Sequence, residues 1–270
     1  MTDKIPYFEN ISLQKRTKSM LKVDFRRMIR SRLFYIMISI ALVTPILITV
    51  MMAMMDGSVS VDPQTGVETV MHGPDNAWQN IGTIPGFESM GGSEIFMMCN
   101  VNMMFMAVAV FVCLFITDDF RCGFSKNLFT TRSGKADYVI SKTVVGSITG
   151  ALLIAAYFIG SILGGAMAGL SFDLHGLSAA NVVACFFAKI FLMPVFVSIF
   201  TLVSVAAKEK AWLAICGSLG GGMLLFMMVS MVTPLNSTFM HVILCIAGSL
   251  MFSIGLGAVS KVVLEKTRLV

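Results

Sequence analysis

Charged side chains are scarce in this chain, since Asp, Glu, Lys and Arg together account for 13% of its 270 residues. A soluble domain usually carries about 25% charged residues. Apolar residues make up 56% of the sequence, and runs of about twenty of them recur, each long enough to cross the ~30 Å hydrocarbon core as a helix. The composition therefore excludes a soluble globular protein and predicts an all-α polytopic membrane protein.

Six apolar runs predict six transmembrane helices, at residues 33–54, 96–117, 143–169, 183–206, 212–232 and 240–260. The chain then divides into a cytoplasmic N-terminus (1–32), a six-span domain (33–262) and a cytoplasmic tail (263–270). The polar and basic N-terminal segment differs from the short start of a cleavable signal peptide. The first outer loop, 55–95, is rich in turn-forming residues, and we expect it either to fold into a small hairpin or to stay mobile.

Lys and Arg are missing from three connections, 55–95, 170–182 and 233–239. Nineteen of the twenty Lys and Arg residues lie instead on the alternate connections and near the two termini. Cytoplasmic loops carry an excess of Lys and Arg, so both termini are predicted to be cytoplasmic. Topology and contact with an anionic lipid bilayer account for the net charge of +5, and we expect no nucleic-acid partner.

No motif for catalysis, nucleotide binding or metal binding occurs in the sequence, and no Asp or Glu falls inside a predicted span. Proton- or sodium-coupled carriers usually need such buried carboxylates, which argues against that class. A His-Glu-x-x-His motif, a Gly-x-Ser-x-Gly elbow and a Gly-x-x-x-x-Gly-Lys-Ser/Thr loop are all missing. We therefore expect no catalytic residue, metal site or cofactor in this chain. If ATP drives this protein, the ATP must bind to another polypeptide.

The one basic residue outside this charge pattern is Lys189, in the fourth predicted span. If that span starts near residue 183, Lys189 lies in the outer leaflet and is a functional candidate. If residues 190–207 span alone, the side chain extends to the outer interface instead. Asn100 and Asn102 open the second span from the same side, where they would line an entrance or hydrogen-bond between helices. These three residues define a candidate substrate path.

Small residues recur at four-residue spacing within the spans, as in the pairs Gly146/Gly150 and Gly160/Gly164. In a membrane, small residues allow helix backbones to approach closely. The sequence leaves open whether the glycines serve tight packing within the chain or, at 220–222, a flexible gate.

The segment before the first span, LQKRTKSMLKVDFRRMIRSR, predicts a basic amphipathic elbow helix. Its apolar face and the arginines beside it follow the helical period: Leu21, Phe25 and Met28 on the face, and Arg26, Arg27 and Arg30 next to it. Such a helix lies in the headgroup region, with its apolar face down and its cations towards anionic lipid. The alternative is a basic anchor that only fixes the orientation of the chain.

The connection between the second and third spans, DDFRCGFSKNLFTTRSGKADYVISK at 118–142, is far longer than a change of direction requires. Within it, Phe120, Phe124 and Leu128 fall on one helical stripe. Gly134 then breaks the helix. A cytoplasmic connection that keeps an apolar face predicts the docking of a partner.

This connection resembles the second cytoplasmic-loop signature of type-2 ABC exporter permeases. That signature has an acidic residue, a Gly four later, a Leu-rich turn, a basic residue about twelve after the Gly, and a Lys seven further on. The matching positions here are Asp119, Gly123, Leu128, Lys135 and Lys142. The family usually has Glu at the first position and Ser-Arg at the basic position, so the match is partial. Six spans, two cytoplasmic termini and the elbow helix extend it over nearly the whole chain.

The resemblance implies a multi-pass subunit of the bacterial plasma membrane that pairs with a second, identical or different permease subunit. The pair would rest on a separate ATP-binding subunit, which holds ATP and Mg. Residues 118–142 would form the coupling helix, with Phe120, Phe124 and Leu128 as apolar anchors and with Arg121, Lys126 and Arg132 setting the register. The expected function is the export of small or amphipathic compounds, such as peptides, drugs or lipids. The alternative is a non-transporting scaffold or sensor subunit that a soluble partner regulates.

Overall fold

The computed structural model describes residues 13–61, 68–70, 72–82, 100–131, 134–174 and 176–266. The elements in chain order are α1 (Leu13–Arg30), α2 (Arg32–Met54), β1 (Val59–Val61), β2 (Glu68–Val70), η1 (Ala77–Asn80), α4 (Met103–Arg121), α5 (Phe124–Thr131), α6 (Lys135–Met167), α7 (Ala179–Ala207), α8 (Ala211–Val232) and α9 (Phe239–Lys266). Arg132 and the ends of the chain, 1–12 and 267–270, lie outside the described residues.

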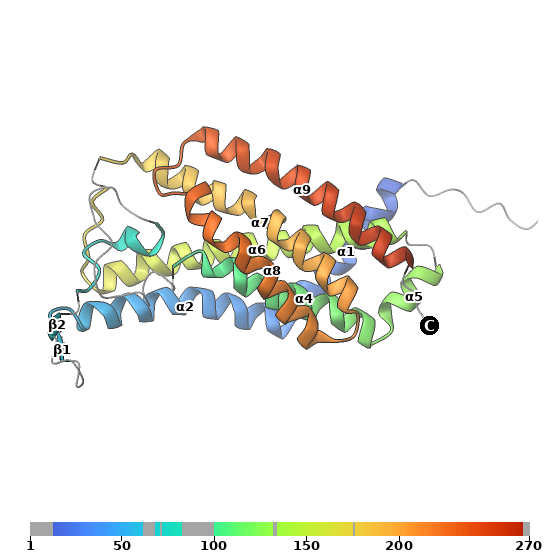
Figure 1. The fold of residues 1–270 in the computed structure, drawn as a ribbon, viewed down its shortest axis with the longest axis horizontal. Coiled ribbons are helices and arrows are strands. Elements are labelled where there is room, and N and C mark those ends of the chain that lie inside the picture. The colour runs from blue at the N-terminus through green and yellow to red at the C-terminus, as the bar shows by residue number, and fades with distance from the viewer. Residues whose placement is uncertain are drawn as a thin grey trace, which may run out of the picture.

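Six of the described helices, α2, α4, α6, α7, α8 and α9, are long and apolar enough to cross a membrane. They run along one common direction, with the β1–β2 hairpin at one end of the bundle and α5 at the other (Figure 1). We call these the hairpin end and the α5 end. The prediction of a helical, membrane-embedded protein with six spans is confirmed at this level. The side of the membrane on which each end lies stays a prediction.

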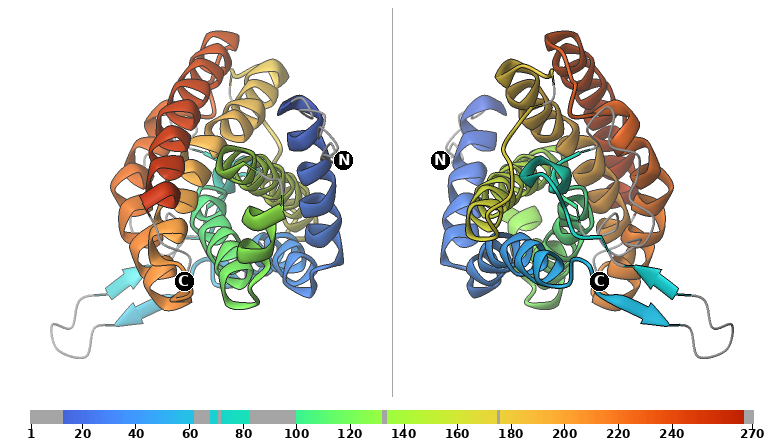
Figure 2. Two further views of the ribbon diagram at one scale, coloured as in Figure 1. Left: turned by 90° about the vertical axis from the view of Figure 1, so that its right-hand side faces the viewer. Right: turned by 90° about the vertical axis from the view of Figure 1, so that its left-hand side faces the viewer.

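The bundle has an inner and an outer set of helices. In the apolar windows of α4 and α6, 61% of the residues are buried, against 17% in α2, α8 and α9. The centre is filled by aromatic and branched side chains of α4, α6 and α7, including Phe105, Val112, Leu153 and Phe196. Seen along the bundle, α1 lies on one flank, and α8 and α9 lie on the opposite flank (Figure 2). The outer helices expose apolar side chains such as Leu224, which suits contact with lipid.

The helix α2 packs along α6, and two glycines of α6 permit the close approach. A Cβ atom added at Gly160 would collide with the backbone oxygen of Leu42, and one added at Gly164 would lie 2.9 Å from the Cα of Ile46. In the same way, Gly146 faces Val197 of α7. These glycines therefore serve packing within the chain. By contrast, a Cβ added at Gly220 would meet nothing within 4 Å.

The helices α4 and α6 extend further into the 118–142 connection than the apolar runs predict. α4 continues to Arg121, and α6 already begins at Lys135, where the Asp137 carboxylate accepts a hydrogen bond from the Gly134 amide at 3.2 Å. Between them Gly123, with φ +72, turns the chain into the eight-residue α5. The apolar stripe of this connection is therefore divided over two helices instead of one.

The connection between α2 and α4, which was predicted to be the first outer loop, contains a hairpin in the part that is described. β1 and β2 pair in antiparallel register, with Val59 opposite Val70. Further on, η1 is tied to the connection between α6 and α7. Asn76 forms a bridge to Ser171, and the Trp78 indole donates a hydrogen bond to the Phe172 carbonyl at 3.1 Å. The two connections at the hairpin end are thus joined.

Candidate functional site

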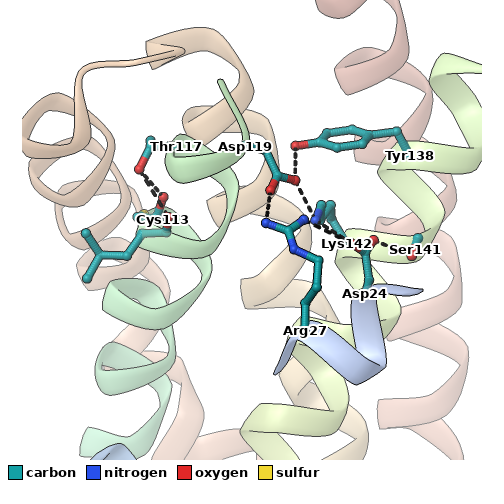
Figure 3. A network of polar contacts seen from close by, with 9 residues as sticks. Asp24, Arg27, Cys113, Thr117, Asp119, Tyr138, Ser141 and Lys142 are labelled. Atoms are coloured by element: carbon teal, nitrogen blue, oxygen red, sulfur yellow. Dashed lines mark hydrogen bonds and ion pairs between the residues drawn. The ribbon is translucent and has the colours of Figure 1, made fainter. Parts of the chain in front are cut away.

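A cluster of buried charged and polar side chains, drawn in Figure 3, lies at the α5 end of the bundle, where Arg27 contacts the Phe124 ring. It joins three helices and consists of Asp24 and Arg27 from α1, Asp119 from α4, and Tyr138, Ser141 and Lys142 from α6. We call it the charge cluster. The spacings i, i+3 in α1 and i, i+3, i+4 in α6 put each contribution on one helical face.

Lys142 lies between the two carboxylates of the cluster. Its Nζ is 2.8 Å from Asp24 Oδ1 and 2.6 Å from Asp119 Oδ2, and all three side chains are at most 1% exposed. Arg27 Nη2 contacts the other oxygen of Asp119 at 2.6 Å. Two carboxylates therefore balance two cations. This balance compensates for the desolvation of charges that would be very unfavourable if any of them were alone.

Two neutral hydroxyl groups also donate hydrogen bonds to the carboxylates. The Ser141 hydroxyl donates to Asp24 Oδ2 at 2.6 Å, and the Tyr138 hydroxyl donates to Asp119 Oδ2 at 3.1 Å. Hydrogen bonds to an ionised carboxylate are stronger than those between neutral groups. The cluster therefore fixes the start of α6 against both α1 and the end of α4.

Aromatic rings connect this cluster to α5. The Arg27 guanidinium lies over the Phe124 ring, 4.5 Å from its centroid, and Lys142 Nζ lies 4.1 Å from the centroid of Phe115. Such cation–π contacts are stronger in a desolvated setting. Phe124 is the first residue of α5, so the cluster holds the point from which this helix leaves the bundle.

Arg27 lies in α1, outside the six apolar helices. Burial by itself would lower the pKa of its guanidinium, but the hydrogen bond and charge of Asp119, together with the charge of Asp24, raise that pKa above its ordinary value. The contribution of Arg27 to stability is therefore fully present at physiological pH and would be lost only at much higher pH.

A second set of contacts binds α1 and α9 to the start of α6. The Thr17 hydroxyl donates to Asp137 Oδ1 at 2.6 Å, and Arg16 Nε lies 3.7 Å from Asp137 Oδ2. Lys135 Nζ donates to the Leu264 carbonyl of α9 at 3.0 Å. The first turn of α6 therefore contacts both α1, the first described helix, and α9, the last one.

The structure places the predicted docking stripe mostly inside the chain. Phe120 is 4% exposed and packs edge-on against Tyr138, with ring centroids 6.3 Å apart. Leu128 is half-buried against the same core. The turn at Gly123 folds α5 back, so this stripe faces the bundle. Arg121 and Lys126 are exposed. Asp119, Lys135 and Lys142 all bond within the chain.

The segment predicted to form the elbow is helical, as α1, but its apolar face is only partly free. Met28 is fully buried, and its sulfur accepts a hydrogen bond from Thr149 of α6 at 3.0 Å. Leu21 is half-buried against the core, whereas Phe25 is 38% exposed. Arg26 and Arg30 are exposed. α1 therefore uses one face to pack on α6, and contact of its remaining surface with lipid headgroups stays a prediction.

Sequence reasoning missed Asp24, Tyr138 and Ser141. One signal for Asp24 was available, because it is the only acidic residue between Leu13 and Arg32. A lone carboxylate in a basic helix that otherwise faces anionic lipid is unfavourable unless a cation pairs with it. Tyr138 and Ser141 carry no such signal, since one helical turn with a tyrosine and a serine is common.

The candidate substrate path is a second buried polar cluster, nearer the hairpin end. Lys189 is 1% exposed, and its Nζ donates to Asn102 Oδ1 at 2.7 Å and to Thr233 Oγ1 at 3.1 Å. Asn102 donates in turn to Ser230 Oγ at 3.1 Å. The side-chain oxygen of Asn100 accepts a hydrogen bond from the backbone amide of Asn102 at 2.9 Å. The lysine therefore points into the bundle and does not extend to the interface.

Removing the Tyr138 hydroxyl should weaken the charge cluster but leave its ion pairs in place. We expect Tyr138→Phe to lower the free energy of unfolding by about 1.5 kcal/mol, because a buried hydrogen bond to a charged group is lost. Unfolding by SDS in mixed micelles measures this. Tyr35→Phe is the matched control, because Tyr35 is 55% exposed on α2. Equal effects of the two substitutions would contradict the role assigned to the hydroxyl.

Comparison with known proteins gives no assignment, since no family model, no characterised protein and no solved structure matches this chain. Within the described ranges, no three His, Cys, Asp or Glu side chains gather as they would around a metal ion.

Proposed function

We propose that this chain is the membrane-spanning permease subunit of an ATP-driven exporter of the type-2 ABC kind. A separate ATP-binding subunit, which carries ATP and Mg, would dock at the α5 end. One observation supports this proposal most strongly: the charge cluster connects α5 with α1, α4 and α6 at a single point. A displacement of α5 by a partner would therefore act on three helices together.

The docking contact would be mainly electrostatic. Phe120 and Leu128 contribute to the core of this chain, so the accessible surface near α5 is provided by Arg121, Lys126 and the exposed side of the α4–α5 turn. Complementary charge sets the orientation and the rate of association more than it sets affinity. We infer that the groove of the partner carries acidic side chains.

The remaining assignments follow from the same proposal. The subunit would pair with a second permease subunit in the plasma membrane of a bacterium. The transported compound would be small or amphipathic, such as a peptide, a drug or a lipid. The six apolar helices and the exposed apolar faces of α2, α8 and α9 support a path within or beside the bilayer.

Charge reversal on α5 tests the docking site. The chain is purified in detergent from its own host, and a co-purifying subunit is identified by its phosphate-binding loop and by vanadate-sensitive ATP hydrolysis. We expect Lys126→Glu to reduce the recovered ATPase about tenfold, which corresponds to roughly 1.4 kcal/mol of binding free energy. Lys126 is exposed, and circular dichroism of the variant checks that the fold persists.

Lys210→Glu is the matched control, because Lys210 is also exposed but lies at the start of α8. It should retain the ATPase. Equal loss with both variants would indicate a diffuse basic surface in place of a site on α5. If no ATPase co-purifies with the native chain, the proposal fails and a scaffold or sensor subunit becomes the better explanation.

A further inference from the structure

Lys189 is a buried cation whose partners are neutral. It lies ten residues inside α7 and is 1% exposed, and its Nζ bonds to an amide oxygen and a hydroxyl oxygen. Within the part of the chain that the structure describes, no ion pair involves Lys189, whereas the charge cluster matches two cations with two carboxylates. An ammonium group without a counter-ion is unfavourable in a desolvated interior. A ligand that supplies negative charge would pair with this ammonium group.

The position of Lys189 suits a ligand that enters from the side. Its partners lie where two neighbouring helices end, since Asn102 immediately precedes α4 and Thr233 immediately follows α8. Asn102 is 4% exposed and bonds to Ser230, which lies on the exposed face of α8. A row of polar groups therefore leads from the outer surface of α8 to the buried ammonium.

The surface around Ser230 is strongly apolar. Met227 is 70% exposed and Met231 is 77% exposed on the same helix. Methionine adapts its shape to different apolar partners. On the inner side, Cys245 of α9 lies close to Lys189 and belongs to a small apolar cluster with Ala188 and Val242. A polar headgroup on an apolar tail matches this arrangement better than a sugar or a free ion does.

We propose that Lys189, Asn102, Thr233 and Ser230 bind the anionic headgroup of a single-chain amphiphile, and that this amphiphile belongs to the class of compound that the protein transports. The recognised group is a phosphate or a carboxylate, and the tail lies along the methionine face of α8. The proposal rests on the function given above, because it names the substrate class of that exporter. It disfavours cationic peptides, since Lys189 repels a positive charge.

Binding of defined amphiphiles tests the site. The protein is placed in nanodiscs of zwitterionic lipid, and its melting temperature is followed while dodecyl phosphate or dodecyltrimethylammonium is added. We expect only dodecyl phosphate to raise the melting temperature. Lys189→Met should weaken its apparent affinity about tenfold or more, and Lys189→Arg should retain most of it. Lys261→Met, which removes an exposed cation, should have no effect.

A second variant keeps the test valid if Lys189→Met does not fold. Ser230→Leu changes the exposed face of α8 and blocks the polar row, so it should also weaken the binding of dodecyl phosphate. Ser39→Leu is its control, because Ser39 is exposed on α2. An equal response to both amphiphiles, or unchanged binding in the Lys189→Met and Ser230→Leu variants, would overturn the site.

Three further outcomes separate this inference from the proposed function. If nanodiscs that contain phosphatidylglycerol give the same Lys189-dependent stabilisation without added amphiphile, the site holds a bilayer lipid, and the substrate assignment is wrong. If the ATPase co-purifies with the Lys189→Met variant but dodecyl phosphate binds neither variant nor native chain, the exporter stands and the anionic site fails. Anion binding without any ATPase would keep the site, but it would remove the assignment to a transported compound.

Discussion

Asp119→Ala should lower the free energy of unfolding by about 3–5 kcal/mol, the range found when one partner of a buried ion pair is removed. The substitution deprives Arg27 and Lys142 of a carboxylate that each contacts at 2.6 Å, and it leaves the Tyr138 hydroxyl without its acceptor. Two buried cations would then share Asp24. Unfolding by SDS in mixed micelles, followed by tryptophan fluorescence, measures the loss.

The neighbouring residue provides the control for this prediction. Asp118 is exposed, so Asp118→Ala should change stability by less than about 0.5 kcal/mol. The double variant Asp119→Ala/Lys142→Met should recover part of the loss, because it leaves one cation with one carboxylate. A double variant that loses the full sum of the single effects would contradict the charge balance that we assign to the cluster.

Gly160→Val should separate α2 from α6 and lower the free energy of unfolding by about 1–3 kcal/mol, the usual range for overpacking. The added side chain would occupy the space of the Leu42 backbone oxygen and would also approach Pro45, whose Cγ is 2.7 Å from the Cβ position. A backbone oxygen cannot move aside as a flexible side chain can, so the helices themselves must shift. The same unfolding measurement applies.

Gly220→Val is the matched control, since that glycine also lies within an apolar helix but an added Cβ meets nothing within 4 Å. Its expected effect is close to zero, because valine and glycine differ little in helix propensity. Comparable destabilisation by the two substitutions would mean that helix propensity decides the result, and not the contact between α2 and α6.

The six spans could be predicted from sequence because hydropathy is a local property, but the limits of two helices could not. Residues 118–142 look like a polar connection, yet Asp119 and Lys142 lie inside α4 and α6. They are tolerated there because they pair with each other and with Asp24, which is 118 positions from Lys142 in the chain. A local pattern contains no information on such pairing.

The partners of the predicted site residues could not be foreseen for the same reason. Phe120 and Phe124 have helical spacing, but Gly123 adopts φ +72 between them, and this turn directs the stripe inward. For Lys189, the choice between the interface and the interior depended on Asn102 and Thr233, which flank two other helices. Phe120, Phe124 and Lys189 were recognised from the sequence, whereas their partners depended on tertiary structure.

The joined connections at the hairpin end have a mechanical consequence. There η1 connects α2 and α6. Asn80 donates a hydrogen bond to Thr49 of α2, and Ala77 packs against Gly165 of α6. At the opposite end, α1, which is continuous with α2 apart from Ser31, is bound to α6 through Lys142. α2 and α6 are thus connected at both ends, so we expect them to move as one rigid unit. If the bundle opens, we expect the rotation to occur between this unit and the pair formed by α7 and α9.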